Sequence, residues 1–316
     1  MIMTTCHDFE SCDTDGSIHL LDFHATVIDG TRTFGAKLFQ LEEHIRRMID
    51  GAREIHSKFD IDDAIVAGLV ECELENQRLK TSNNESQQIL AARFAICFPE
   101  SDLRSSTAKL MIKIHDISRP IRALRTRYQH GCSLTVVPQR AIPVSLIPHQ
   151  IKSRGSSHFR RAELMAQRLQ PGSWALLLHE DGCVSEGVGI GISGWNIWTA
   201  TGDQLNTLGA DRAVDGIAKR YLIDVARNIG LACCERDMEL REFLEADEVF
   251  VTSSTLGIMP VKEINGFNLN RGSVWGKVSM SLRTEFERAF QFSLVDNLPL
   301  NAANSQFKGQ NSDAFV

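Results

Sequence analysis

The spacing of apolar positions predicts a unit of helices and strands over residues 15–117. Apolar and polar residues alternate over three short stretches, as in strands with one buried face. Between the first and second stretches, apolar residues recur at helical spacing. The predicted elements are a strand at 37–41, helices at 42–59 and 61–80, a polar turn at 81–88, and strands at 89–98 and 110–115.

The periodicity stops over residues 118–131, where Pro120 stands among basic residues that a strand interior would not accommodate. We therefore predict an interdomain linker there. Beyond it, the pattern predicts a mixed α/β domain at 132–295 and a flexible tail at 296–316. Its predicted elements are strands at 134–137, 174–179, 195–200 and 248–252, and helices at 159–169, 212–229 and 273–292.

Length and charge narrow the class of protein. A chain of 316 residues with 43% hydrophobic residues can fill two cores of ordinary size. A net charge of -6 gives no reason to expect nucleic acid or an anionic membrane as the main partner, so small molecules are better candidates. The start of the chain is acidic where a secretory signal needs basic residues, and no segment is apolar for long enough to span a bilayer. We expect a cytoplasmic protein.

The eight cysteines do not follow a metal-binding or disulfide pattern. The sequence has no C-x-x-C pair, and only Cys233 and Cys234 lie close together, as immediate neighbours. We therefore expect reduced thiols and no bound metal.

Residues 189–194 fit the spacing G-x-G-x-x-G of dinucleotide-binding proteins. That fingerprint requires a strand before it and a helix after it, so that a pyrophosphate can lie at the helix N-terminus. Residues 195–199 have the composition of a strand instead. We therefore reject a dinucleotide site, and interpret the glycines as positions where the backbone approaches a flat group.

A series of short motifs occurs in the order and spacing of a known family. The motifs are VIDGTRTF (27–34) with FQLEEHIRRM (39–48), IKSR (151–154), DGCVSEG (181–187), DGIAK (215–219), ADEVFVTSST (246–255), MPV (259–261) and ING (264–266). Over roughly residues 27–290 the chain thereby resembles the fold-type IV pyridoxal-phosphate enzymes. These include branched-chain and D-amino acid aminotransferases, R-selective amine transaminases and aminodeoxychorismate lyases.

The resemblance implies an α+β fold of two domains, a smaller N-terminal α/β sandwich and a larger C-terminal mixed α/β domain. It implies pyridoxal 5'-phosphate as cofactor, bound as an imine to Lys152. A lysine in this role needs burial or neighbouring positive charge to lower its pKa, and Arg154 is a candidate for that charge. Glu186 falls where the family places an acid against the pyridine nitrogen, which keeps the ring an electron sink.

For the cofactor phosphate, the resemblance indicates three groups. Arg47 would supply a guanidinium clamp, Ile217 and Ala218 the free N–H groups of a helix N-terminus, and Ser253 and Ser254 hydroxyl donors. Without the resemblance, an arginine on a charge-rich helix would be read as a solvated side chain.

For the substrate, the resemblance indicates Arg93 and Thr255. In an alternating strand, Arg93 is either an exposed charge or an anchor for a substrate carboxylate. Phe94, Trp195 and Trp198 are candidate pocket walls, but aromatic residues in strands belong to the core more often.

The chain also departs from the family pattern. The asparagine usually found five residues after the glutamate is replaced by Gly191, and the threonine and arginine of the phosphate-binding turn by Ala218 and Lys219. Ser157 stands in place of a frequent tyrosine, and the N-terminal strands are expected to be shortened to little more than 15–25.

These observations predict a homodimeric transaminase that moves an amino group from an amino acid, of apolar and branched-chain-like side chain, to an oxoacid such as 2-oxoglutarate. Two alternatives stay open. One is a lyase resembling aminodeoxychorismate lyase; the other is a catalytically impaired cofactor-binding homologue, suggested by Gly191, Ala218 and Ser157.

Overall fold

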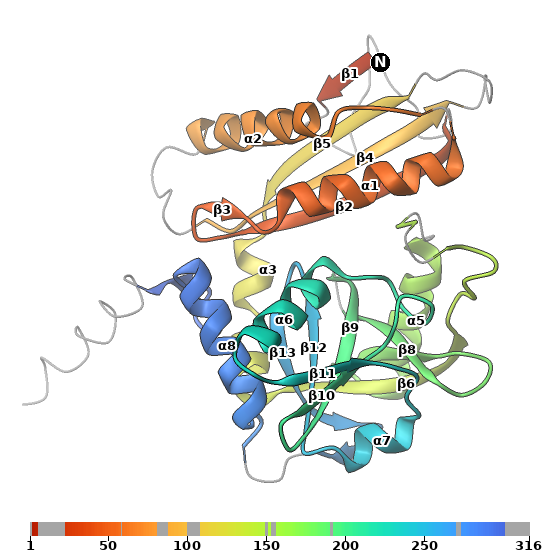
Figure 1. Ribbon diagram of the computed structural model, residues 1–316, viewed down its shortest axis with the longest axis vertical. Coiled ribbons are helices and arrows are strands. Elements are labelled where there is room, and N and C mark those ends of the chain that lie inside the picture. The colour runs from red at the N-terminus through yellow and green to blue at the C-terminus, as the bar shows by residue number, and fades with distance from the viewer. Residues whose placement is uncertain are drawn as a thin grey trace, which may run out of the picture. The chain divides into compact units, whose positions relative to one another are not determined.

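The computed structural model separates into two compact units (Figure 1). The N-terminal unit comprises residues 1–118 with 150–154, and the C-terminal unit comprises 119–149 with 155–316. Both contain helices and sheets, so the predicted α+β class is confirmed. Separate domains at 15–117 and 132–295 stay a prediction. The structure describes residues 2–5, 23–57, 59–80, 88–99, 108–148, 151–152, 156–189, 192–269 and 273–300.

The N-terminal unit is a five-stranded sheet with two helices packed against it (Figure 1). The strands lie in the order β1-β5-β4-β2-β3, and β1 pairs with β5 in parallel while the other pairings are antiparallel. The elements are β1 (Ile2–Thr5), β2 (Phe23–Phe34), β3 (Lys37–Leu38), α1 (Leu41–Ile55), α2 (Asp63–Lys80), β4 (Leu90–Pro99) and β5 (Lys109–Asp116).

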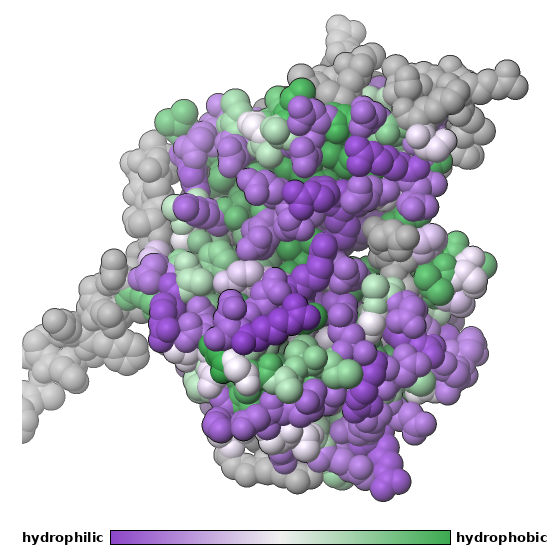
Figure 2. Space-filling model, in the orientation of Figure 1, coloured by the Kyte–Doolittle hydropathy of each residue, from purple (hydrophilic) through white to green (hydrophobic). Residues whose placement is uncertain are grey.

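The helix α1 has an apolar stripe that faces the interior of the unit. Ile45, Met48 and Ala52 recur at helical spacing and are buried, while hydrophilic residues cover the side of α1 seen in Figure 2. The buried stripe also contains two polar side chains, His44 and Arg47. Burying such groups costs free energy unless they are paired, so their place on the inner face indicates a partner in the sheet.

Two predictions for this unit were wrong in their bounds. The strand predicted at 37–41 is the two-residue β3, and the helix predicted to reach residue 59 ends at Ile55. The expected shortening of the early strands to 15–25 was also wrong, because β2 continues to Phe34. Its inward positions include the buried polar residues Asp29, Thr31 and Thr33, which break the apolar alternation that marks a strand.

The C-terminal unit is built on a sheet of nine strands in the order β11-β10-β9-β12-β13-β6-β7-β8, with β14 paired to β13. A further pairing of β8 with β9 closes the strands from β9 to β8 into a ring. The strands are β6 (Cys132–Arg140), β7 (Trp174–Leu178), β8 (Val184–Gly189), β9 (Ile192–Thr201), β10 (Gln204–Thr207), β11 (Ala232–Glu235), β12 (Glu248–Ser253), β13 (Gly257–Ile264) and β14 (Phe267–Asn268), and a separate pair is formed by β15 (Phe292–Ser293) and β16 (Leu298–Pro299).

Helices pack on this sheet from several parts of the chain (Figure 1). The helix α5 contacts β6, β7 and β8, while α6 contacts β12, β11 and α8. The helices of the unit are α3 (Ser118–Arg122), α4 (Arg125–His130), α5 (Ser156–Leu169), α6 (Ile217–Asn228), α7 (Leu240–Glu245) and α8 (Lys277–Phe290). Residue 118, which opens α3, belongs by its contacts to the N-terminal unit.

The structure revises several predictions for this half. Residues 118–131, predicted to be an interdomain linker, contain α3 and α4. The helix predicted from residue 212 begins at Ile217, because Gly216 is its extended N-cap residue. The predicted tail at 296–316 begins within an ordered segment, since β16 pairs with β15, and residues 301–316 lie outside the described ranges.

The glycine-rich segment confirms one exclusion. The strand β8 precedes it and β9 follows it, so no helix opens there and the dinucleotide fingerprint lacks its context. The aromatic residues weighed as pocket walls belong to the core: Phe94, Trp195 and Trp198 are each at most 2% exposed.

Within the described ranges, no helix is both long and apolar enough to cross a bilayer. The same residues contain no group of three potential metal-binding side chains. Six cysteines fall in these ranges, and all are free thiols: Cys72, Cys97, Cys132, Cys183, Cys233 and Cys234.

Candidate active site

A buried ionic cluster in the N-terminal unit surrounds the carboxylate of Asp29, whose side chain is 0% exposed. Arg47 donates to it from Nε at 2.8 Å and from Nη2 at 2.9 Å. His44 donates from Nδ1 at 2.9 Å, and Nζ of Lys152 lies 3.5 Å from the same carboxylate oxygen. We call these four residues the Asp29 cluster. It brings the predicted imine lysine and one predicted phosphate ligand to a single carboxylate.

Three elements assemble the Asp29 cluster. Asp29 lies on β2, and His44 and Arg47 lie three residues apart on the buried face of α1. The backbone of Lys152 is fixed to the same strand, because the N–H of Ile28 donates to its carbonyl oxygen at 3.1 Å. The polar residues found on the inner face of α1 therefore have their partner in β2.

The surroundings of Lys152 lower the pKa of its amine, and burial is the largest cause. Removal from water lowers the pKa of its ammonium group, and the charges of Arg47 and Arg93 lower it further, while Asp29 opposes them. A lower pKa increases the fraction of neutral amine, which is the form that attacks an aldehyde. Arg154, proposed from the sequence as a source of charge, lies outside the described residues.

The pKa values of Asp29 and His44 are lowered as well, each for its own reason. Burial by itself would raise the pKa of Asp29, but Arg47, Lys152 and His44 together hold that pKa well below its ordinary value. Burial lowers the pKa of His44 to about 4, against the pull of Asp29. At neutral pH, His44 is therefore a neutral ring that donates from Nδ1. Among the described residues, no hydrogen-bond partner reaches its buried Nε2.

Arg93 lies on β4, in register with Gly30 of β2. Its side chain is exposed, while Ala91 and Ala95, two positions before and after it, are buried. Its charge contributes to the lowered pKa of Lys152. Both interpretations of this arginine, as a solvated charge and as a carboxylate anchor, are consistent with this placement.

Glu186 lies on β8 in the C-terminal unit and is 4% exposed. Close packing holds the strand in place next to Glu186. A Cβ atom on Gly187 would lie 2.1 Å from the ring of Trp195, and one on Gly189 would lie 2.8 Å from the ring of Trp174. These glycines allow two indole rings to pack directly on the backbone, which holds the strand that carries the carboxylate.

The first turn of α6 offers backbone donors. The first N–H groups of a helix have no partner within the helix, and in the described part of this turn no side chain caps them and no acidic residue occupies the turn. Ile217 and Ala218, the predicted phosphate ligands, provide two of these groups. The N-cap Gly216 lies so close to Asn196 that a Cβ atom there would be 2.0 Å from its Oδ1.

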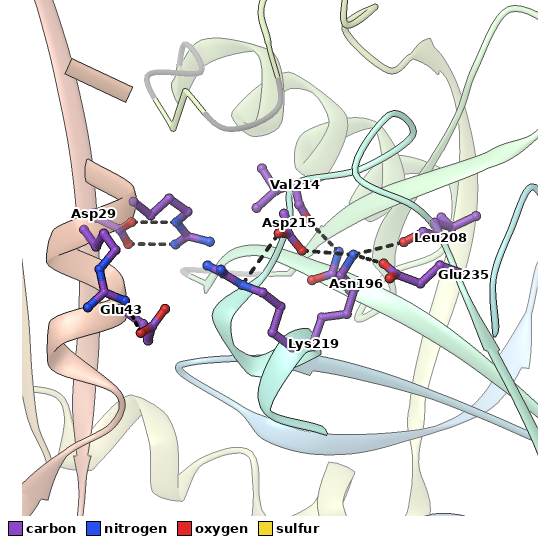
Figure 3. Close-up of polar contacts among 11 residues, drawn as sticks. Asp29, Glu43, Asn196, Leu208, Val214, Asp215, Lys219 and Glu235 are labelled. Carbon is purple, nitrogen blue, oxygen red and sulfur yellow. Dashed lines mark hydrogen bonds and ion pairs between the residues drawn. The ribbon is translucent and has the colours of Figure 1, made fainter. Parts of the chain in front are cut away.

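Lys219 anchors this turn through contacts with three other residues (Figure 3). Its side chain is 1% exposed, and Nζ lies 3.2 Å from the carbonyl oxygen of Leu208, 3.1 Å from Asp215 and 2.5 Å from Glu235. Lys219 therefore does not point away as a free cation. It pairs with Asp215, the acid that precedes the turn, and ties the turn to Leu208 and to the end of β11.

Asn196 is a buried polar residue that the family motifs did not identify as a candidate. Gly191, where an asparagine was expected, lies outside the described residues. Asn196 stands ten residues after Glu186, is 4% exposed, and donates from Nδ2 to the carbonyl oxygen of Val214 at 2.8 Å (Figure 3). The signal was an amide between Trp195 and Ile197, an uncommon residue type for a core strand.

The remaining predicted residues lie at the end of β12 and on α5. Ser253 is 8% exposed, and its Oγ accepts the N–H of Leu256 at 3.1 Å, so its own hydroxyl proton is available to another acceptor. Ser254 and Thr255 follow in the turn between β12 and β13 and are half-buried. Ser157 is exposed on α5.

Three comparisons connect this chain to known proteins. The family described as "Amino-transferase class IV" matches residues 26–264. A probable branched-chain-amino-acid aminotransferase of Rickettsia bellii is 23% identical over 261 residues, which cover 81% of this chain and 84% of that protein. An aminodeoxychorismate lyase of Bacillus subtilis is 33% identical over 114 residues, 36% of each chain.

A solved structure has a similar fold. The T.th. branched-chain amino acid aminotransferase with pyridoxamine 5'-phosphate superposes with a TM-score of 0.71 at 21% identity, and the match covers 89% of this chain and 90% of that one. The motifs that suggested the family in the sequence fall almost wholly inside residues 26–264.

Proposed function

The chain belongs to the class IV aminotransferases, and we propose that it transfers an amino group from an apolar, branched-chain-like amino acid to an oxoacid such as 2-oxoglutarate. Members of this family use pyridoxal 5'-phosphate. The observation that carries the proposal is the amine of Lys152, which has a lowered pKa and lies in the ionic cluster around Asp29.

The residues present fit this cofactor. An amine of lowered pKa suits its aldehyde, a buried carboxylate suits its ring nitrogen, and uncapped N–H groups and hydroxyls suit its phosphate. We assign these roles to Lys152, Glu186, the α6 turn and the hydroxyls of Ser253 and Ser254. The cofactor supplies the electron sink that stabilises the negative charge left when a substrate loses its α-proton.

The chain's own residues perform the remaining steps. Nζ of Lys152 would hold the cofactor and, once displaced by a substrate amine, take up and return the α-proton. Asp29 keeps this amine oriented and opposes its loss of charge, while Arg47 and burial favour the neutral form. Arg47 would serve the phosphate only if its guanidinium exchanged part of its contact with Asp29 for the incoming anion.

The proposed substrate class rests on the names of the relatives and on two candidate residues. Relatives carry the name branched-chain-amino-acid aminotransferase, and Arg93 and Thr255 are our candidates for contacts with the substrate. Substrate preference is tested by following the absorbance of the cofactor-loaded protein against a panel of L- and D-amino acids and simple amines. Bleaching by valine, leucine or isoleucine supports the proposal.

The decisive experiment is borohydride reduction of the cofactor-loaded protein followed by peptide mapping. We expect the label on Lys152 and no label in Lys152→Ala. We also expect Lys152→Ala to lose at least ~10³-fold in turnover, because it removes the proton-transferring amine. Labelling at another lysine, or none in saturated protein, contradicts the proposal.

A lyase activity is the second candidate, favoured by the 33% identity to an aminodeoxychorismate lyase. That match covers 36% of the chain, whereas the match to the aminotransferase of Rickettsia bellii covers 81%. The two reactions differ in their need for an oxoacid: amino transfer requires one and elimination does not. A catalytically impaired homologue would bind the cofactor while no donor bleached its absorbance.

A homodimer and a cytoplasmic location complete the proposal. Light scattering of the cofactor-loaded protein tests the first, and cell fractionation tests the second. A monomer at working concentration contradicts the proposed assembly.

A further inference from the structure

Asn196 lies against the first turn of α6, and we propose that it is a positioning residue for phosphate binding by that turn. This inference rests on the proposed function, because it assumes that the phosphate of pyridoxal 5'-phosphate binds there. Asn196 would not touch the phosphate. It would act through Val214 and Gly216, which determine where the N–H groups of Ile217 and Ala218 point.

The first argument is the hydrogen bond from Nδ2 of Asn196 to the carbonyl oxygen of Val214, 2.8 Å long. Val214 lies two residues before the N-cap residue, so this bond fixes the chain as it enters α6. Asn196 itself lies on β9 and is 4% exposed. A buried, hydrogen-bonded amide on a paired strand is a rigid support, because its rotamer is fixed by packing.

The second argument is the close approach of Gly216. A Cβ atom on this residue would lie 2.0 Å from Oδ1 of Asn196 and 3.2 Å from its Cγ. The φ of Gly216 is −69°, an ordinary value for any residue, so the glycine is required by space and not by backbone conformation. The amide of Asn196 thus occupies the place of a missing side chain beneath the turn.

The third argument is the pairing of strands. Asn196 is in register with Thr252 on β12, and the next residue of that strand is Ser253. Since Asn196 also binds the entry to α6, it connects the turn to the strand end that carries the predicted hydroxyl donors. The N–H donors of the turn and the hydroxyl donors after β12 are therefore both positioned relative to Asn196.

Lys219 provides a second support. Its Nζ contacts Asp215, Glu235 and the carbonyl oxygen of Leu208, so it ties the turn to the residues at the ends of β10 and β11. The carboxylate of Asp215 is also 3.6 Å from Nε of Arg220. This pairing reduces the repulsion that an acid one residue before the N-cap would exert on an anion. The turn is thus fixed by two buried side chains, and its leading N–H groups are left for a ligand.

The test compares pyridoxal 5'-phosphate with pyridoxal, which lacks the phosphate. Dissociation constants of both are measured by absorbance titration of the full-length cofactor-free protein, in the wild type and in Asn196→Ala. We expect wild-type protein to prefer the phosphorylated form. In Asn196→Ala we expect affinity for that form to fall about 10- to 100-fold, and affinity for pyridoxal to change little, because misplaced donors affect only the phosphate.

Asn297→Ala is the matched control. Asn297 is 1% exposed and its Nδ2 donates to the carbonyl oxygen of Leu294 at 2.8 Å, so the variant also removes a buried bond from an amide to a backbone carbonyl. It should leave the ratio of the two dissociation constants unchanged. Gly216→Ala disturbs the same contact from the turn and should reproduce the selective loss, which keeps the test valid if Asn196→Ala folds poorly.

The outcomes separate this inference from the proposed function. A wild-type preference for the phosphorylated form that neither Asn196→Ala nor Gly216→Ala reduces overturns the inference alone. Equal weakening of both ligands also overturns it, because that indicates a general loss of structure. A wild type with no preference for the phosphate overturns the inference together with the phosphate site on which it rests.

Discussion

The Asp29 cluster and the α6 turn organise polar groups in opposite ways. In the N-terminal unit, a buried carboxylate is surrounded by two cations and a neutral imidazole, and the contacts are ion pairs and charged hydrogen bonds. At the α6 turn, the predicted ligands are neutral backbone N–H groups. The turn is held by the amide of Asn196, the close contact at Gly216 and the ion pairs of Lys219. One region is held by charge and the other by close packing.

The difference matches the chemistry proposed for each region. An amine that must lose and regain a proton needs a defined electrostatic environment, which buried charges provide. A doubly charged phosphate needs donors that are already oriented before it arrives. Substitutions should therefore act through charge balance in the Asp29 cluster and through volume at the α6 turn.

The largest expected effect is that of Asp29→Asn. This change keeps the shape of the side chain but leaves Arg47 and Lys152 without their counter-ion, and removal of one partner from a buried ion pair costs about 3–5 kcal/mol. Urea unfolding measures the loss. Asp50→Asn is the control: Asp50 pairs with Arg53 at the surface, is 56% exposed, and should cost at most about 1 kcal/mol. Equal losses in the two variants would refute the role of charge balance.

Acid sensitivity should reveal the contribution of His44. The pKa of His44 is about 4 in the folded protein, against an ordinary value of 6.5, so the unfolded chain binds a proton first as pH falls. Stability should therefore fall between pH 6.5 and about 4, by roughly 3 kcal/mol. His44→Gln, which keeps a donor for Asp29, should flatten this part of the stability curve. His130→Gln, at an exposed position, should not, and identical curves for all three proteins would contradict the assignment.

Volume should dominate at the α6 turn. Gly216→Ala adds one methyl group where Oδ1 of Asn196 lies 2.0 Å away, and we expect a loss of roughly 1–3 kcal/mol of unfolding free energy. Thermal or urea denaturation measures it. Unchanged stability would mean that the turn yields easily, and the contrast between the two regions would then disappear.

The smallest effect has the opposite sign. Gly68 lies within α2, and nothing lies within 4 Å of a Cβ atom built there. Gly68→Ala should therefore stabilise the protein by about 0.5–1 kcal/mol, because alanine loses less backbone entropy in a helix. The same substitution thus tests open space at residue 68 and a close contact at residue 216. Destabilisation at both positions would indicate an effect unrelated to the space around the glycine.

Sequence patterns predicted the α+β class, most of the longer helices and the family. They worked best where burial alternates simply, as in β5, and in α1, whose apolar stripe is clear. They were wrong where buried polar residues replace apolar ones. The strand β2 was missed because Asp29, Thr31 and Thr33 occupy its inner face. The start of α6 was placed five residues early, because the helix begins only after Gly216, whose backbone is extended.

The site was only partly accessible from sequence. Motif spacing identified Lys152, Arg47 and Glu186 as candidates, but it could not show that Arg47 and Lys152 share the carboxylate of Asp29. That contact joins residues more than a hundred positions apart. Asn196 was missed for a related reason: no motif in the sequence marks it, and only the fold shows that its amide meets the turn.

The two indole rings that lie on β8 limit which sequences this enzyme can accept. Any side chain at residue 187 would have to displace Trp195 or the carbonyl of Ala175, only 2.3 Å from its Cβ position. A library randomised on both sides of Glu186 should therefore return glycine at 187 among its active clones. Substitutions meant to change the reaction would then have to be made at positions other than 187.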